Sequence, residues 1–242
     1  MAMAALSDRG KVRPINEDSF CLPNGQMYLA LVADGMGGHQ AGEVASDMAA
    51  SILSELAAKR GGKDISVKTA VSWVRKANAA IYASAQANPA QRGMGTTLTF
   101  LYFMHQRVML GHVGDSRCYR LRDGQLAQLS TDHSLVQELV RNGTITQEEA
   151  RNHPYKNIIT RALGADEQVQ VDAHDLQLNR SDVFLLCSDG LTDYLTDEEL
   201  QGILLEQETD LQQKARKMVD IALERGGRDN ITVLLLDGEV AP

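Results

Sequence analysis

The pattern of apolar and polar positions divides the chain into strands and helices that come in blocks. Short apolar runs rich in Val, Leu, Ile and Phe predict strands, and apolar residues at helical spacing predict helices. The predicted strands are Met3–Ser7, Asp18–Leu22, Met27–Ala33, Thr96–Met104, Arg107–Val113, Ser116–Arg122, Gln125–Leu129, Gln168–His174, Asp182–Ser188 and Asn230–Leu236. The predicted helices are Ala41–Lys59, Val67–Gln86, Thr196–Leu205 and Thr209–Glu224, with a polar, helix-leaning segment from Ser134 to Arg151.

The connections between these elements predict how they are arranged. The Gly61-Gly62-Lys63-Asp64 break predicts a turn between two antiparallel helices. The four strands between Thr96 and Leu129 are joined by very short turns, including Asp123-Gly124, and predict an antiparallel meander. Strand blocks that alternate with paired helices predict an α+β fold, a four-layer α/β/β/α sandwich with two central antiparallel sheets flanked by paired helices.

Size and charge narrow the class of protein. We expect the 242 residues to form a single domain, because no Pro-, Ser- or Gly-rich linker interrupts the pattern. A net charge of -8 argues against nucleic acid or a membrane surface as the main partner. No apolar run approaches the roughly 18 to 20 residues of a membrane span, and the first residues do not read as a signal peptide. Three widely spaced cysteines fit a reducing cytoplasm, and the absence of an exposed apolar repeat predicts a monomer.

Four acidic residues stand at the ends of apolar runs. Asp34 and Asp189 each close a strand, Asp18 begins one, and Asp229 precedes the last. Taken singly, Asp34-Gly35 is as compatible with a turn as with a ligand, but the set of four favours a metal site on rigid strand ends. An all-oxygen ligand set without His or Cys suits Mg²⁺ or Mn²⁺ better than Zn²⁺.

An ordered series of motifs makes the prediction specific. In chain order these are Arg13-x-x-Asn16-Glu17-Asp18, Asp34-Gly-Met-Gly-Gly-His39, Gly95-Thr-Thr97, Gly114-Asp115-Ser-Arg117, Thr131-x-His133-Ser134, Ser188-Asp189-Gly190 and Asp229-Asn230. With them the chain resembles the metal-dependent serine/threonine protein phosphatases of the PPM, or protein phosphatase 2C, family. The match runs nearly end to end, and the compact length resembles the bacterial branch of the family.

The resemblance implies a set of metal ligands. Asp34 would bridge two tightly held Mn²⁺ or Mg²⁺ ions, and the carbonyl of Gly35 would be a further ligand. Asp18 would act mainly through bound water, and Asp189 and Asp229 would complete the pair. The resemblance also implies a third, weaker ion, held by Asp115 together with Asp189. A water between the two tightly held ions would attack phosphorus in line.

The resemblance gives roles to residues outside the ligand set. Arg13 would receive the substrate phosphate, although composition alone reads it as a surface arginine. Eukaryotic members place a histidine directly after Asp-Gly, where this chain has Met36. His39 and His153 are therefore the candidates for the general acid, and metal-bound water is the alternative. Residues 134–163 would form a flap that selects protein substrates, or else an ordinary helical insertion.

The implied activity is metal-dependent hydrolysis of phosphoserine and phosphothreonine in proteins, opposing a serine/threonine protein kinase. Phosphorylated proteins and that kinase would be the partners. Two rival hypotheses stay open: a catalytically degenerate module that binds phosphoproteins, and a hydrolase of small phosphate esters. Intact acids at all four strand ends count against the first rival, and the fold alone does not decide the substrate.

Overall fold

The computed structural model describes residues 2–25, 27–37 and 41–240, and the strands in these ranges form two antiparallel sheets. One sheet has the order β1-β11-β10-β7-β8, and the other has the order β2-β3-β5-β6-β9, with β4 paired to β3. The strands are β1 Met3–Asp8, β2 Asp18–Cys21, β3 Leu29–Met36, β4 Gly95–Thr96, β5 Leu98–Met104, β6 Arg107–Val113, β7 Arg117–Arg122, β8 Gln125–Gln128, β9 Asp172–Gln177, β10 Val183–Cys187 and β11 Ile231–Asp237. The α-helices are α1 Ala41–Ala58, α2 Val67–Ala87, α3 Leu135–Arg141, α4 Gln147–Arg151, α5 Asp189–Thr192, α6 Asp197–Leu204 and α7 Leu211–Glu224; short 3₁₀ turns span Pro89–Gln91 and Gly238–Val240.

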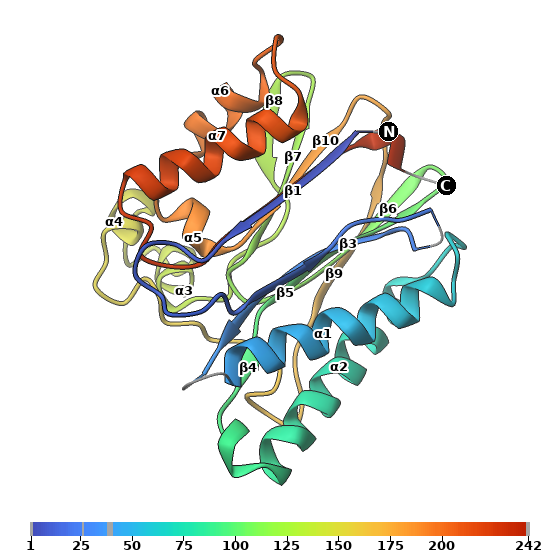
Figure 1. The fold of residues 1–242 in the computed structure, drawn as a ribbon, viewed down its shortest axis with the longest axis vertical. Coiled ribbons are helices and arrows are strands. Elements are labelled where there is room, and N and C mark those ends of the chain that lie inside the picture. Colours follow the sequence, from blue (N-terminus) through green and yellow to red (C-terminus); the bar gives the residue numbers. More distant parts are fainter. Residues whose placement is uncertain (1, 26, 38–40, 241–242) are drawn as a thin grey trace.

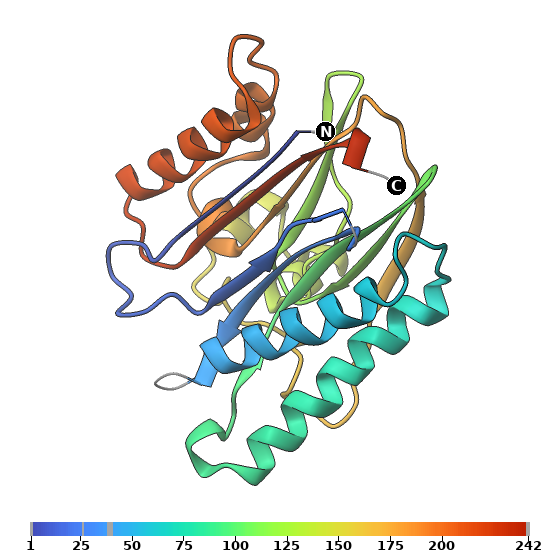
Figure 2. The same cartoon turned by 45° about the vertical axis from the view of Figure 1, so that its right-hand side comes forward.

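The sheets pack face to face, and a pair of helices covers each outer face. Figure 1 shows α1 and α2 on the side of the sheet that contains β3 and β5, and α6 and α7 on the side that contains β1 and β10. Figure 2 shows the same order of layers, with α1 and α2 running side by side. Three apolar clusters fill the spaces between the four layers. The predicted α+β sandwich with an antiparallel helix pair is confirmed.

Burial on both faces explains why the central strands read as continuous apolar runs. In β3, Leu29, Leu31 and Ala33 pack toward α1 and α2, whereas Ala30 and Val32 pack between the sheets. Because successive side chains of a strand point to opposite faces, a strand in a middle layer needs apolar residues at every position.

The predicted meander is wrong, because the chain changes sheets between its second and third strands. Strand β6 pairs with β5 and β9, whereas β7 pairs with β10 and β8. The crossing begins at Gly114, whose φ of 109° is rare for other residues and where an added Cβ would lie 2.6 Å from the Thr97 side chain. The hairpin at Asp123-Gly124 is confirmed: both residues have positive φ, as a two-residue type I′ turn requires.

The predicted strand Gln168–His174 lies too early in the sequence, because β9 begins only at Asp172. The preceding loop is fixed to α2 instead of to the sheet. Asn78 of α2 donates to the carbonyls of Asp166 and Glu167 and accepts the N–H of Gly164. These side-chain bonds replace the ladder bonds of a longer strand.

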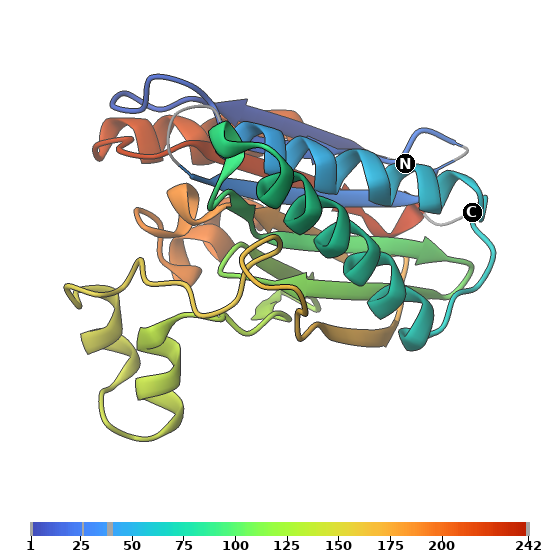
Figure 3. The same cartoon turned by 90° about the horizontal axis from the view of Figure 1, so that it is seen from below.

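Residues 134–163, predicted as a flap, contain α3 and α4. Figure 3 shows these two helices projecting away from the layered body. Ser134 caps α3, and Thr146 forms a capping box with Glu149 at α4. The two ends of the segment meet in a bridge between Ser134 and Ile159, so that the segment leaves and rejoins the body at one place.

The cysteines and the helix lengths are two further features of the described chain. Cys21, Cys118 and Cys187 are free thiols. Among the helices formed by residues 2–25, 27–37 and 41–240, none is both long and apolar enough to cross a membrane.

Candidate active site

The predicted metal ligands lie where the two sheets meet at one end. Asp18 at the start of β2 is directly opposite Asp34 in β3. Asp189 follows β10 as the first residue of α5, and Asp229 lies two residues before β11. Asp115 is in the connection from β6 to β7. Elements far apart in the sequence therefore bring the five acids together.

Asp18 is held by hydroxyl groups from the opposite sheet. Ser188 Oγ and Thr232 Oγ1 donate to Asp18 Oδ2 over 2.8 Å and 2.6 Å. The other oxygen, Oδ1, is shielded from solvent and has no hydrogen-bond partner. These bonds join the sheets and fix the orientation of the carboxylate, while Oδ1 stays free of protein hydrogen bonds.

The backbone around Asp34 is fixed while its carboxylate stays available. The Asp34 N–H donates to Thr97 Oγ1 at 2.9 Å, and the Thr97 N–H donates to the Asp34 carbonyl at 2.9 Å. At Gly35 an added Cβ would lie 2.2 Å from the carbonyl oxygen of Gly42 and 2.6 Å from that of Glu17. Only glycine fits this close approach of three backbone segments.

The electrostatics of the acids show how close they are to one another. Burial raises the pKa of Asp34 well above its usual range, and the charges of Asp18, Asp189, Asp115 and Asp229 raise it further. Burial and neighbouring acids act in the same direction on Asp189. Burial also raises the pKa of Asp18 to about 6 and that of Asp115 to about 7. A divalent cation would relieve this repulsion, because it favours the charged carboxylates.

The donor set fits a hard divalent cation that keeps part of its water shell. Within the part of the chain that the structure describes, no three His, Cys, Asp or Glu side chains are arranged to hold a cation by themselves. However, Asp18, Asp115 and Asp189 each have a buried carboxylate oxygen without a partner. Mg²⁺ and Mn²⁺ take such oxygens, and Mg²⁺ usually retains several waters. The residues therefore fit Mn²⁺ or Mg²⁺.

Arg13 is at the rim of this cluster. Its Nη2 atom lies 2.6 Å from Asp229 Oδ2, and its side chain is 45% exposed. The bond to Asp229 is the largest cause that raises the pKa of Arg13. Arg13 is thus charged, accessible and next to the acids, as a phosphate-binding residue must be.

Of the two candidates for the general acid, His153 lies within the described residues. His39 lies outside them. His153 lies in the flap segment, where its Nδ1 accepts the N–H of Tyr155 and its ring packs against the Tyr155 ring. Both assignments stay predictions.

Two residues of the site were quoted in the motifs without a role. Glu17 is only 7% exposed, its Oε1 has no partner, and burial raises its pKa. The sequence signal that Glu17 belongs to the site was its position next to Asp18. Asn230 accepts the Glu17 N–H and donates to the carbonyls of Arg9 and Ile15. It fixes the loop that carries Arg13 against the start of β11.

A cleft of about 240 Å³ extends from the acids to the flap segment. Asp115 and Asp189 line one part of it, and Arg151 and Lys156 of the flap segment line another. Lys156 Nζ lies 2.8 Å from Asp193 Oδ1, which joins the flap segment to the end of α5. The cleft is therefore bounded by charged groups from both the body and the flap segment.

Comparison with known proteins identifies the family. The family model for protein phosphatase 2C matches residues 14–235. The chain belongs to the protein phosphatase 2C family. The resemblance read from the ordered motifs is confirmed, and so is the prediction that the chain is a protein phosphatase of bacterial type.

Individual members of the family are similar over nearly the whole chain. The serine/threonine phosphatase stp of Listeria monocytogenes is 42% identical over 245 residues, which cover 97% of this chain and 94% of that protein. The crystal structure of the Mycobacterium tuberculosis serine/threonine phosphatase PstP/Ppp superposes with a TM-score of 0.90 at 42% identity, and covers 98% of this chain and 97% of that one. A structure of the PstP catalytic domain in complex with two manganese ions has a TM-score of 0.86 at 41% identity, over 98% and 97% of the two chains.

Proposed function

We propose that this chain is a single catalytic domain that hydrolyses phosphoserine and phosphothreonine in proteins, using two Mn²⁺ or Mg²⁺ ions. The observation that carries the proposal is a set of repelling, partly buried carboxylates with unpartnered oxygens on Asp18, Asp115 and Asp189. Such a set is costly to fold unless cations bind it. The names of the relatives, serine/threonine phosphatases, and the manganese in the PstP structure support the same reaction.

The proposed ligands are Asp18, Asp34, the Gly35 carbonyl, Asp189 and Asp229, with Asp115 and Asp189 for a third, weaker ion. When bound, such ions supply Lewis-acid stabilisation of the phosphoryl group and lower the pKa of water to provide a nucleophile. The residues of the chain do the rest: the hydroxyls of Ser188 and Thr232 orient Asp18, and the backbone bonds with Thr97 fix Asp34.

Arg13 has the role of phosphate binding in this proposal. Its guanidinium presents paired donors to phosphate oxygens. In the structure it is bonded to Asp229. Were Asp229 to hold a cation, the Asp229 carboxylate would bind Arg13 less strongly, and a guanidinium donor of Arg13 would be free for the substrate. Arg13 thereby holds the phosphate in the ground state and the transition state.

The flap segment supports a protein substrate over a small ester. A cleft runs from the acids to Arg151 and Lys156, and it offers a surface beyond the phosphate-binding point. A small ester would leave this surface uncontacted. We further propose that the enzyme opposes a serine/threonine protein kinase in the cytoplasm, and that it acts as a monomer.

Phosphate release from a phosphothreonine peptide by chelator-stripped protein, with and without Mn²⁺, tests the proposal. We expect turnover only with Mn²⁺. The variants Asp34→Ala, Asp189→Ala and Asp229→Ala should be folded and inactive, and Asp220→Ala on the exposed face of α7 is the matched control. A folded Asp34→Ala variant with near-normal turnover would remove Asp34 from the ligand set. A folded, metal-loaded wild-type protein without activity would favour the degenerate binding module.

A comparison of substrates separates the second rival. At matched concentrations, the enzyme should hydrolyse the phosphopeptide with a higher kcat/KM than p-nitrophenyl phosphate. Equal or reversed values would favour a hydrolase of small esters.

A further inference from the structure

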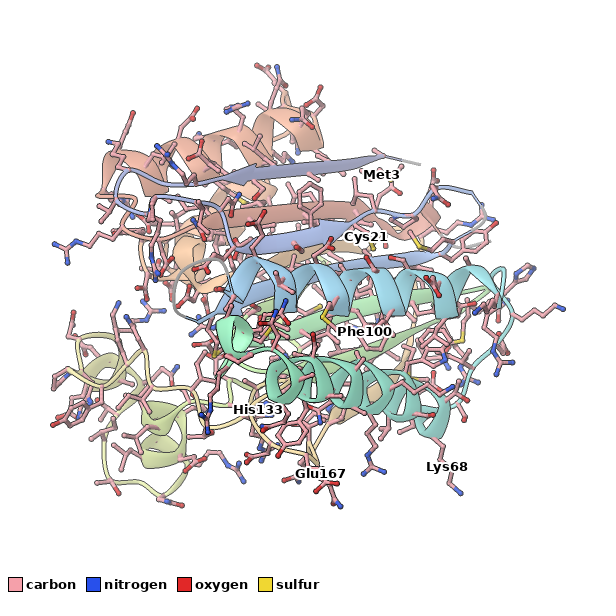
Figure 4. All side chains as sticks on the ribbon, turned by 60° about the horizontal axis from the view of Figure 1, so that its bottom comes forward. Met3, Cys21, Lys68, Phe100, His133 and Glu167 are labelled. Carbon is pink, nitrogen blue, oxygen red and sulfur yellow. The ribbon has the colours of Figure 1, made fainter. Side chains whose placement is uncertain are left out.

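His133 is a buried histidine where the flap segment joins the body. It is 5% exposed and lies immediately before Ser134, the first residue of the segment. Figure 4 labels it between the projecting flap helices and the layered body. No step of the proposed reaction uses it, although its ring and its backbone both bond to the connection that carries Asp115.

The hydrogen bonds of the ring determine its tautomer. The Gly114 N–H donates to Nδ1 at 3.0 Å, so Nδ1 must be unprotonated. Nε2 then carries the proton and donates to Asp172 Oδ2 at 3.2 Å. Arg161 Nη1 lies 3.2 Å from Nε2 and 3.3 Å from Asp172 Oδ1. The guanidinium charge thus balances the charge of the Asp172 carboxylate that accepts the Nε2 proton. A neutral imidazole satisfies both ring nitrogens.

Burial favours the same neutral form. Desolvation is the largest cause that lowers the pKa of His133, and the charge of Arg161 lowers it further. The ring of His112 lies with its centroid 4.8 Å from that of His133. His112 is itself fixed by Thr99 Oγ1 and the Thr131 carbonyl. The pair of rings forms a rigid support between β6 and the residues that lead into the flap segment.

The support holds both sides of Asp115. On one side, His133 bonds to Gly114 twice, through Nδ1 to its N–H and through its own backbone N–H to the Gly114 carbonyl. On the other side, the Ser116 carbonyl accepts Thr99 Oγ1 at 3.0 Å, and Ser116 Oγ bonds to Thr97 Oγ1 at 2.7 Å. Asp115 is therefore fixed by its two neighbours, while its own Oδ1 stays without a partner.

The far side of His133 is attached to the end of the flap segment. The Thr160 N–H donates to the His133 carbonyl at 2.8 Å, and Arg161 contacts the ring and Asp172. One residue thus connects both ends of the flap segment to the loop of Asp115.

We propose that His133 is a positioning residue that holds Asp115 for the weaker cation through the Nδ1 bond to Gly114 and couples this cation site to the flap segment. The inference rests on the proposed function, since it concerns one carboxylate of the proposed ligand set. A ligand carboxylate whose backbone is loosened loses metal affinity, because its orientation is no longer determined before binding.

The proposal is tested by titrating chelator-stripped protein with Mn²⁺ in the absence of substrate and measuring Mn²⁺ binding by electron paramagnetic resonance. Asp115→Asn identifies the weaker site. His133→Leu removes the ring acceptor at similar volume and should weaken that site about tenfold, leaving the tighter sites unchanged. His133→Asn places an amide oxygen near the position of Nδ1, and should therefore bind Mn²⁺ nearly as the wild type does.

Activity gives a second readout with a characteristic pattern. With His133→Leu we expect a loss of turnover at low Mn²⁺ that is restored at high Mn²⁺, because only affinity has changed. His133→Asn should need no extra Mn²⁺. A role in packing alone would leave the Mn²⁺ requirement of both variants unchanged.

Lys214→Met is the control for a general loss of stability, because it removes a buried bond from Lys214 Nζ to the Leu204 carbonyl in the α6–α7 layer. Unchanged Mn²⁺ affinity in folded His133→Leu would overturn the proposal. The proposal would also be overturned if His133→Asn or Lys214→Met weakened Mn²⁺ binding as much as His133→Leu does. It would be overturned as well if Asp115→Asn removed no Mn²⁺ site that the wild type has. Failure of the wild type to hydrolyse a phosphopeptide would instead overturn the proposed function, because the titration contains no substrate.

Discussion

Asn230 should contribute more to the free energy of unfolding than a polar side chain that makes a single exposed hydrogen bond. It is 3% exposed and makes three bonds to one loop: from the Glu17 N–H at 2.8 Å, and to the carbonyls of Arg9 and Ile15 at 2.9 Å and 3.0 Å. Asn230→Ala leaves these three backbone groups without partners. Each unsatisfied buried group costs about 1–3 kcal/mol, and entering water recovers part of this, so we expect a loss of about 3–4 kcal/mol.

Urea denaturation of the metal-free protein measures this loss directly, and thermal unfolding should show a fall in Tm of roughly 10 °C at 2–4 °C per kcal/mol. The matched control is Asn88→Ala. Its side chain makes an exposed bond to the Ala90 N–H, at a position where such a change costs about 0.5–2 kcal/mol. If Asn230→Ala costs no more than Asn88→Ala, the three bonds do not hold the loop and the reasoning is refuted.

Other perturbations test the site. Arg13→Ala should raise KM for a phosphopeptide by about 10- to 100-fold, since bonds to charged groups contribute about 1.5–3 kcal/mol; a loss in kcat alone would contradict phosphate binding in the ground state. Lys156→Ala should raise KM for a phosphoprotein by up to about fivefold and leave KM for p-nitrophenyl phosphate unchanged. The control Lys217→Ala breaks an exposed ion pair with Glu206 and should change neither KM value. The folded chain raises the pKa values of Asp18 and Asp115 to about 6 and about 7. Ionisation of these two carboxyl groups should therefore lower the stability of the metal-free protein as the pH rises from about 4 through these values, so the stability gained on adding Mn²⁺ should grow over this range; a gain that does not grow would refute it.

The sequence predicted the layers of this fold because apolar patterning alone determines them. A short apolar run such as Leu29–Ala33, followed by a helical pattern, indicates a strand buried on both faces, and its alternate residues do pack toward the helices and between the sheets. The sheet change after Val113 could not be read in the same way. A hairpin and a crossing both begin with a short turn containing glycine, and the difference lies in the contacts of Gly114 with Thr97 and His133. Such contacts between distant segments have no local signal.

The candidate site was predicted from acids at strand ends, and the residues that support these acids were not. Asp34 and Asp189 stand out only as a set with Asp18 and Asp229, because an Asp-Gly pair taken singly is as compatible with a turn as with a ligand. Ser188, Thr232 and Asn230 are ordinary strand-end residues in the sequence, and their roles follow only from the distances to Asp18 and Glu17. The polar, helix-leaning sequence of residues 134–151 predicted helices there, but the Lys156 ion pair depends on the position of α5 and could not be inferred.

The geometry of the acids implies that metal binding and stability are linked in this protein. Asp18 and Asp34 lie opposite each other in adjacent strands. Burial raises the pKa of both, and neighbouring acids raise it further: Asp229 for Asp18, and four acids for Asp34. Without cations, neutral pH forces the fold either to retain protons on these groups or to bear their repulsion. A cation that binds the folded chain and not the unfolded one stabilises it in proportion to its affinity and concentration. We therefore expect the carboxylates that oppose folding in the metal-free protein to stabilise the folded chain once the proposed cations bind.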